Sequence, residues 1–593
     1  MAMKRAVPIV GTLMWFAEAA RQNASLLVTS GANSGVTSPL QPLYMRTAHS
    51  QSSNAYDSRG IESDRDNRSR SVHAQPSHGE NAIGFLGDSG YMSMFPATYA
   101  RTSADEGLTI GSRYLVKPLS PFIRKCYIDI FDEFCSTFCP ILDVELLDSS
   151  QSLLLEQALA LVTTTIQPAL LTEAEPSVHY SKARELFNSD AEANPLVSLI
   201  AIMLFYWWST TSPNVVSKNG SWYWTGVAIR QAQEMGLHKQ LPGSHGGHWP
   251  GDSQALRSRI WWTLYARERL TSMSQGRPCI IDPDDCTIGK PSPQDFHSAH
   301  WQHGEVFVHY VDLCGIVGHV AEHLRRHPNV KEQSDQLFVR LHAWSSALPD
   351  YLRLPYSRGS SARYARDIRQ LHLPYLSALI LLGMKRPERS THAMSTLAAS
   401  SIARIFEDFL VGGNLRFLQG MAGWYVTLAL LALIRASQVQ VLKDAAEGAI
   451  EVLVAALGDL AQRWPSAKMF QDGVEQLRAS LASASMVRNE NHAEEPTGAA
   501  ASCKNLALVV AGQVEVENMS ETDIHEALRY FPGASRNSTP IFDILLSLTG
   551  PLDALNHQDD FDAAFLDLFN DMDNPLSSFL LPGYDVREIR LRG

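Results

Sequence analysis

The sequence predicts an all-α protein, and three features of its 593 residues indicate that class. From Pro121 to about Ala484, apolar residues recur at spacings of three and four, which is the period of an amphipathic helix. Glycine and proline interrupt this pattern every ten to twenty residues, as they do at helix ends. Few segments show the alternation of a strand. We therefore expect Phe131 to Leu477 to be almost wholly helical, with no sheet beyond a stray hairpin.

The two longest apolar runs predict buried helices. They span Leu196 to Trp208 and Trp424 to Ile434. Both are shorter than the roughly 18–20 residues that a membrane-spanning helix needs. We expect no membrane segment and no membrane partner.

Two further helices have recognisable ends. The first is expected from Trp222 to Met235 and ends at Gly236, because glycine accepts the left-handed conformation that follows many helices. The second is expected from Ser253 to Met273 and ends near Gly276. These two helices carry most of the bulky and charged residues in the middle of the chain.

The second of these helices carries an apolar stripe that ends in a carboxylate. Leu256, Ile260 and Leu264 repeat at intervals of four residues, and Glu268 continues the series. Glu268 is therefore expected to point inward. A buried carboxylate needs a partner, and we expect Arg277 or another nearby guanidinium to supply it.

Both ends of the chain differ from this helical middle. Residues 1–84 are polar, with few bulky apolar side chains between Ser30 and Glu80, and are predicted to be disordered. Residues 485–550 are assigned to a linker with a short helix near Ile524 to Tyr530. Residues 551–593 form an acidic tail.

The tail has the composition of an activation segment. Pro551 to Asp585 holds eight aspartates and no lysine or arginine. Acidic residues interleaved with aromatic ones stay solvated until a partner groove accepts the rings. We expect coactivators as partners, and the alternative is a C-terminal helix docked on the chain's own core. The expected anchors are Phe561, Phe565, Leu568, Phe569 and Met572.

Charge and cysteine content limit the class of protein. A net charge of −12 argues against nucleic-acid binding by the chain as a whole, because phosphate neutralisation needs clustered lysine and arginine. The seven cysteines are scattered and do not form a disulfide framework. Both observations fit the cytosol or the nucleus.

Four short motifs follow one another in the middle of the chain, and their order is more specific than any one of them. They are Gly236-Leu237-His238, Arg259-Ile260-Trp261-Trp262, Gly276-Arg277-Pro278 and the acidic Asp282-Pro283-Asp284-Asp285. This order resembles the helical regulatory domain, or middle homology region, of fungal transcription factors of the binuclear zinc-cluster family.

The resemblance implies a nuclear transcription regulator with no enzymatic activity. It assigns residues 85–484 to the regulatory domain. It also implies that certain motif residues support that domain structurally; these are Gly236, Leu237, Arg259, Trp262, Glu268, Gly276, Arg277 and Pro278.

The zinc cluster of the family is missing from this sequence. That cluster needs six cysteines in two Cys-x2-Cys groups within about thirty residues. The first cysteine here is Cys126, and Cys126, Cys135 and Cys139 have the wrong spacing. We expect no cofactor in this chain. Promoter DNA is then contacted directly only if a zinc module lies upstream of this sequence, and otherwise through a partner in a homo- or heterodimer.

Two histidines raise a metal-site alternative. The segment from His319 to His323 matches the His-x-x-Glu-His pattern of inverted zinc peptidases, yet that site needs a third, distant ligand. We favour a polar helix face. Similarly, Gly87 to Gly90 echoes a serine-protease motif in a region without the required β-barrel context, and we treat that match as accidental.

Two further groups have alternative interpretations. Arg257 and Arg259 offer either a basic face for a partner or salt-bridged flanks of a buried helix, which we favour. Four tryptophans are either pocket walls or core, and we favour core; they are Trp222, Trp224, Trp261 and Trp262.

The resemblance, together with the acidic tail, implies a pathway-specific activator, with a secondary-metabolite gene cluster as the favoured target because members of this family often control such clusters. One alternative is a modulator that cannot bind DNA and heterodimerises with a related regulator. Another is a regulator of nutrient-use or lipid-catabolism genes.

Overall fold

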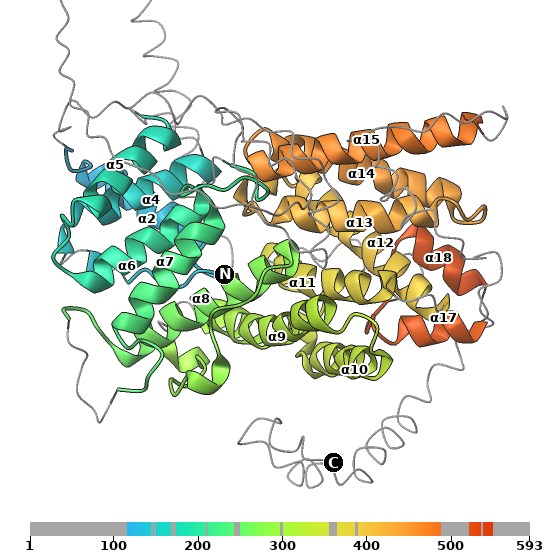
Figure 1. Ribbon diagram of the computed structural model, residues 1–593, viewed down its shortest axis with the longest axis horizontal. Coiled ribbons are helices and arrows are strands. Elements are labelled where there is room, and N and C mark those ends of the chain that lie inside the picture. Colours follow the sequence, from blue (N-terminus) through green and yellow to red (C-terminus); the bar gives the residue numbers. More distant parts are fainter. Residues whose placement is uncertain are drawn as a thin grey trace, which may run out of the picture. The chain divides into compact units, whose positions relative to one another are not determined.

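The computed structural model is all-α, as the sequence predicts (Figure 1). No strand occurs among the residues that it describes. Those residues are 116–143, 146–147, 150–167, 174–208, 211–241, 249–296, 301–354, 365–385, 389–487, 521–534 and 538–548.

The first group of helices surrounds one almost completely buried helix. Every residue of α4 after its first is buried, because α2, α5 and α6 pack against it. A short 3-10 turn, η4 (Phe205–Trp207), continues α6 toward the rest of the domain. The helices are α2 (Pro121–Phe134), α4 (Leu153–Ile166), α5 (Pro176–Asn188) and α6 (Pro195–Leu204).

Helices α7 (Ser221–Glu234) and α8 (Gln254–Gln275) end as the sequence predicts. Gly236 and Gly276 have φ of 67° and 63°, the left-handed conformation that glycine adopts without steric cost. At the start of α8, the hydroxyl of Ser253 accepts the amide of Leu256 at 3.2 Å. The buried α8 packs along α9 (Trp301–Arg326).

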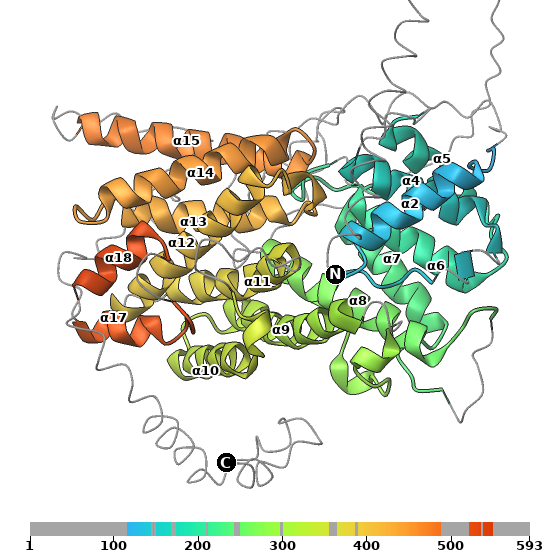
Figure 2. The same cartoon turned by 180° about the vertical axis from the view of Figure 1, so that it is seen from behind.

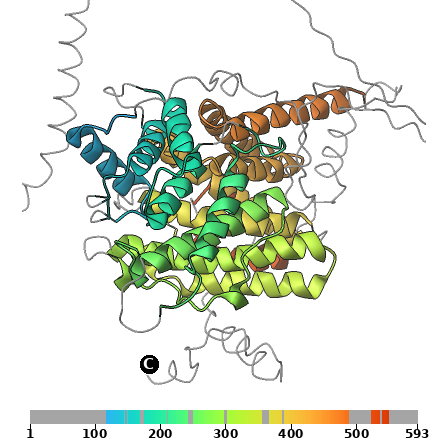
Figure 3. The same cartoon turned by 60° about the vertical axis from the view of Figure 1, so that its left-hand side comes forward.

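The C-terminal half continues as a series of neighbouring helices, which can be followed in Figures 1 and 2. Helix α11 packs on α9 and α12, α12 on α13, and α13 on α14; Figure 3 shows α15 beside α14. The elements are α10 (Lys331–Ala347), α11 (Ala365–Met384), α12 (Arg389–Val411), η9 (Leu415–Phe417), α13 (Ala422–Ala436), α14 (Lys443–Ala461) and α15 (Pro465–Val487).

The two long apolar runs are buried, as predicted. Every residue from Leu196 to Leu204 of α6 except Ser198 is buried, and so is every residue of α13 except Arg435. Among the described helices, none is both long enough and apolar enough to cross a membrane.

Part of the segment assigned to a linker packs on the helical domain. Helices α17 (Glu521–Leu528) and α18 (Pro540–Ser547) lie against α12. The rings of Phe531 and Phe542 meet edge to face with centroids 5.5 Å apart, and both are buried. The acidic tail and the segment from Gly87 to Gly90 lie outside the described residues, and so do all five predicted tail anchors.

Candidate functional site in the polar core

Helix α8 carries ionised side chains that are buried. The guanidinium of Arg257 donates to both carboxylate oxygens of Asp252, at 2.6 and 2.8 Å, and lies 5.8 Å from the ring of Trp249. A two-point contact of this kind is the strong geometry for a buried ion pair. Arg257 is therefore a salt-bridged flank of a buried helix, which is the interpretation that the sequence favours.

Arg259 and Trp262 tie α8 to the segments on either side of it. Arg259 lies 3.6 Å from the carboxylate of Asp143 and 6.0 Å from the ring centre of Phe296. The indole of Trp262 donates to the carbonyl of Gly289 at 2.8 Å. Both side chains hold connecting segments against the helix.

Glu268 points inward as predicted, with only 1% of its surface exposed. Arg277, the first candidate for its partner, was wrong; two other guanidinium groups, Arg269 and Arg230, lie near enough to favour its charge without hydrogen-bonding it. Among the described residues, its carboxylate accepts hydrogen bonds from the backbone amides of Ile280 (2.5 Å) and Ile281 (3.1 Å). Burial raises the pKa of Glu268, while these two amides and the charge of Arg269 oppose the shift.

Arg277 has other partners. Its guanidinium donates to the side-chain oxygen of Gln275 (2.7 Å) and the carbonyl of Pro213 (2.9 Å), and lies 5.2 Å from the ring of Trp222. Its own carbonyl accepts the hydroxyl of Ser272. The Gly-Arg-Pro turn therefore joins the end of α8 to the segment before α7.

An open groove of about 1140 Å³ runs beside this turn. Trp222 lines it, whereas Trp224, Trp261 and Trp262 are buried. Both interpretations of the four tryptophans therefore apply, each to different residues. Other residues of the groove wall are Tyr223, Gln275, Pro278 and Ile280.

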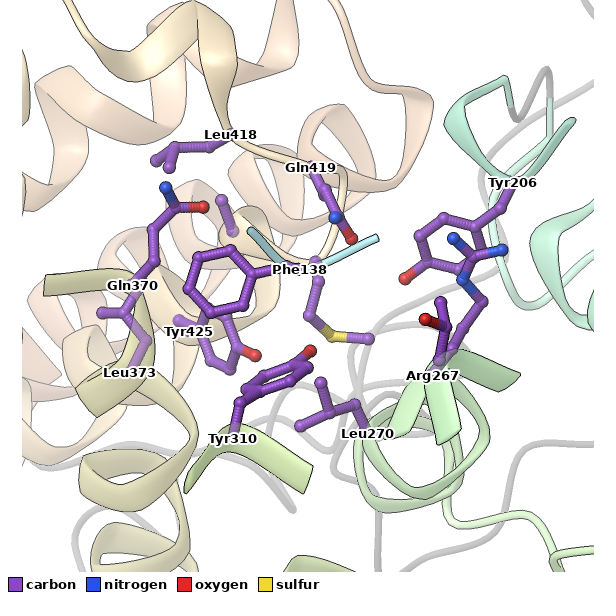
Figure 4. Close-up of a pocket in the computed structure, with 13 residues that line it drawn as sticks. Phe138, Tyr206, Arg267, Leu270, Tyr310, Gln370, Leu373, Leu418, Gln419 and Tyr425 are labelled. Atoms are coloured by element: carbon purple, nitrogen blue, oxygen red, sulfur yellow. The ribbon is translucent and has the colours of Figure 1, made fainter. Parts of the chain in front are cut away.

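A second, smaller cavity of about 50 Å³ lies where α8, α9, α11 and α13 converge (Figure 4). Polar side chains from η4, α8, α9, α11, α13 and the segment before α13 contribute to its wall. Figure 4 shows the guanidinium of Arg267 against the ring of Tyr206, at 3.9 Å from its centroid. The lining also includes Phe138, Thr263, Leu270, Tyr310, Gln370, Leu373, Leu418, Gln419, Met421 and Tyr425.

The phenols of this cavity are neutral hydrogen-bonding groups. Burial raises the pKa of Tyr206, and it raises the pKa of Tyr310 and of Tyr425 well above the ordinary value for tyrosine. Each phenol therefore keeps its proton at neutral pH and can donate it. The cavity can hold a small polar molecule.

The candidate metal ligands have ordinary partners. His319 Nδ1 lies 2.7 Å from the carbonyl of Gly315, and Glu322 forms an ion pair with Arg326 at 2.5 Å. Within the described part of the chain, no group of three or more histidine, cysteine or acidic residues could hold a metal ion. His323 is buried, and its Nδ1 lies 3.4 Å from the side-chain oxygen of Gln333, so only part of this segment is a polar, exposed face.

The sequence analysis did not single out the cavity residues Tyr206, Arg267, Tyr310 and Tyr425. One signal was available, since Arg267 follows Leu264 by three residues and Ile260 by seven, on the buried stripe of α8. The three tyrosines carry no such signal. They come from η4, α9 and α13, which are far apart in the sequence.

Part of this chain matches the model of a known protein family. Residues 131–337 match the family model described as "Fungal specific transcription factor domain". The match covers α8, its motifs and most of the first half of the helical domain. No solved structure matches the chain.

Curated relatives carry the same type of name. The chain is 28% identical to the acetamidase regulatory protein of Aspergillus oryzae over an alignment of 297 positions. This alignment covers 46% of this chain and 35% of the relative. It is 30% identical to cutinase transcription factor 1 alpha of Fusarium vanettenii over 182 residues, 28% of this chain and 20% of that protein. The chain therefore spans about a third or less of the length of these relatives.

Proposed function

We propose that the chain is a nuclear regulator of transcription, because residues 131–337 match the family model described as a fungal specific transcription factor domain. The family match over the buried α8 region is the observation that carries the proposal. The similar proteins are named as regulators, which is consistent with a role that is not enzymatic.

The target genes are proposed from the names of the relatives. One is named for an acetamidase and the other for a cutinase, each a single catabolic enzyme. These names favour the nutrient-use alternative over a secondary-metabolite cluster. We propose that this chain controls genes for enzymes that release a nutrient from an amide or ester.

Deleting the gene tests this target class. The deletion strain and its parent are grown with an amide, with a plant polyester, or with glucose and ammonium, and their transcripts are sequenced. The proposal expects hydrolase genes to lose induction on the first two substrates only. Loss confined to a biosynthetic gene cluster would favour the secondary-metabolite assignment.

We further propose that the acidic tail is the activating segment and recruits coactivators. Its eight aspartates carry no compensating lysine or arginine and are interleaved with aromatic residues, a composition that suits binding to a partner groove. Fused to an unrelated DNA-binding domain, residues 551–585 should drive a reporter gene. Replacing Phe565 and Phe569 by alanine should abolish expression, because the two rings supply most of the apolar area that is buried on contact.

Single aspartate variants show how much each acidic charge contributes, in comparison with the two aromatic rings. Replacing any one aspartate by asparagine should only weaken the reporter, since one exposed charge contributes about 1 kcal/mol or less. A silent wild-type fusion contradicts the activation proposal. The heterodimerising modulator would then be the better assignment.

Contact with promoter DNA is proposed to come through a partner or an upstream zinc module. This sequence lacks a six-cysteine cluster and carries a net charge of −12. Purified chain should bind a target promoter fragment only when nuclear extract is added. Binding by the purified chain alone, at physiological salt, would contradict this part of the proposal.

A further inference from the structure

The guanidinium of Arg267 is a buried charge, and within the described part of the chain no carboxylate pairs with it. Only 6% of the residue is exposed. Its hydrogen bonds go to the carbonyl of Met203 (2.7 Å) and the sulfur of Cys139 (3.7 Å). Among the described residues, no aspartate or glutamate forms an ion pair with it, in contrast to Arg257 on the same helix.

The neighbours of Arg267 do not supply the missing negative charge. Burial raises the pKa of the Cys139 thiol, although Arg267 itself favours the thiolate, and burial also raises the pKa of Tyr206. Both groups stay protonated at neutral pH. The guanidinium cannot become neutral to avoid the cost of burial, since arginine is not deprotonated in proteins. A buried charge of this kind is costly unless an anion reaches it.

The cavity beside Arg267 presents further donors. Among the described residues, the side-chain nitrogen of Gln370 is buried with no hydrogen-bond partner, and the ring of Tyr425 lines the same cavity. Figure 4 shows both residues in the cavity wall, with the amide of Gln419 between them and Arg267. These donors lie on α8, α11, α13 and the segment before α13, so a ligand in the cavity would link four parts of the domain.

From this convergence we propose that the cavity is a binding site for a small carboxylate, with Arg267 as its counter-ion and the amides and phenols as additional donors. A volume of about 50 Å³ takes about three to five water-sized groups. That is the size of a short monocarboxylate such as acetate. The site is a ligand site beyond the proposed transcriptional role, and its test does not depend on that role.

The test is calorimetric titration of the full-length chain with sodium acetate, against sodium chloride at equal ionic strength. A ligand this small is expected to bind with a dissociation constant of about 0.1 to 10 mM, and the titration should therefore reach about 50 mM. Acetamide is the neutral control, because it has nearly the same shape and no charge. The proposal expects saturable binding of acetate and at least tenfold weaker binding of acetamide.

Three variants locate the site. Arg267→Gln should weaken acetate binding at least tenfold, and Tyr425→Phe about threefold, because it removes one donor without changing the shape of the ring. Arg463→Gln is the matched control, since Arg463 pairs with Asp459 away from the cavity, and it should bind acetate as wild type does. If Arg267→Gln does not fold, Tyr425→Phe and Gln370→Leu provide the same test.

Three results would overturn the proposal. The first is that acetate gives no more heat than chloride up to about 50 mM. The second is that acetamide and acetate bind with equal affinity. The third is that the folded cavity variants bind acetate as tightly as wild type does. The first result means that water alone fills the cavity, the second that the site does not recognise the negative charge, and the third that acetate binds elsewhere.

Discussion

Helices α8 and α13 are both buried, yet α8 carries several charged side chains whereas the side chains of α13 are almost all apolar. Helix α13 is nearly all apolar, with Arg435 as its one charged residue. Helix α8 buries Arg257, Arg267, Glu268 and Arg269. The apolar helix is stabilised by packing alone, whereas the charged helix needs a specific partner for each group. Burial alone therefore does not tell whether a helix serves only as core.

The largest effect is expected at the ion pair of α8. Arg257→Ala or Asp252→Ala should each lower the free energy of unfolding by about 3–5 kcal/mol, because either change leaves one buried charge without a partner. Urea unfolding measures this. The double variant Asp252→Ala/Arg257→Leu should lose much less than the sum. Additive losses would show that the pair does not act as a unit.

In α13 the stability of the fold should depend on the volume of each buried side chain, because almost none of them has a charge or a specific partner. Leu430 is fully buried, so Leu430→Ala should cost about 2–5 kcal/mol by leaving a cavity. Leu430→Met nearly conserves volume and should cost less than about 1.5 kcal/mol. The same unfolding measurement applies, and a methionine variant as unstable as the alanine variant would break the contrast with α8.

A buried group that can lose its charge should behave differently from the arginines of α8. Burial lowers the pKa of His372 in α11 to about 4. The unfolded chain binds this proton near pH 6.5 and the folded chain does not, so stability is present above pH 6.5 and is lost as pH falls toward 4. The loss from His372 is about 3 kcal/mol by pH 4.

The variant His372→Leu isolates this contribution. Among the described residues, its Nδ1 bonds only the carbonyl of Ile368 within the same helix, so the substitution breaks no long-range hydrogen bond there, although it removes an edge-to-face contact with Trp344. Unfolding measured from pH 7 to pH 4 should give a shallower slope for the variant than for wild type. Parallel slopes would mean that the pKa of His372 is the same in the folded and unfolded states.

The smallest effect is expected at Glu268. Glu268→Ala leaves the amides of Ile280 and Ile281 without an acceptor and should cost about 1–3 kcal/mol. Glu268→Gln keeps an acceptor oxygen and removes the buried charge, so it should cost less than about 1 kcal/mol. Thermal unfolding of the two variants side by side measures the difference. A glutamine variant as unstable as the alanine one would show that the charge itself is required.

The sequence by itself determined the class of fold and the ends of α7 and α8. Apolar spacing depends on helix geometry alone, and Gly236 and Gly276 take a backbone conformation that other residues avoid. The same spacing placed Glu268 on the inner face of α8. Local rules therefore sufficed wherever one helix decides the outcome.

Only the tertiary structure decided what these inner faces meet. The segment after α8 folds back and offers the amides of Ile280 and Ile281 to Glu268, where the sequence suggested a guanidinium. The donors around Arg267 come from segments more than a hundred residues apart, such as Tyr425. Periodicity tells which side of a helix is buried, whereas the partner on the other side depends on how distant helices pack.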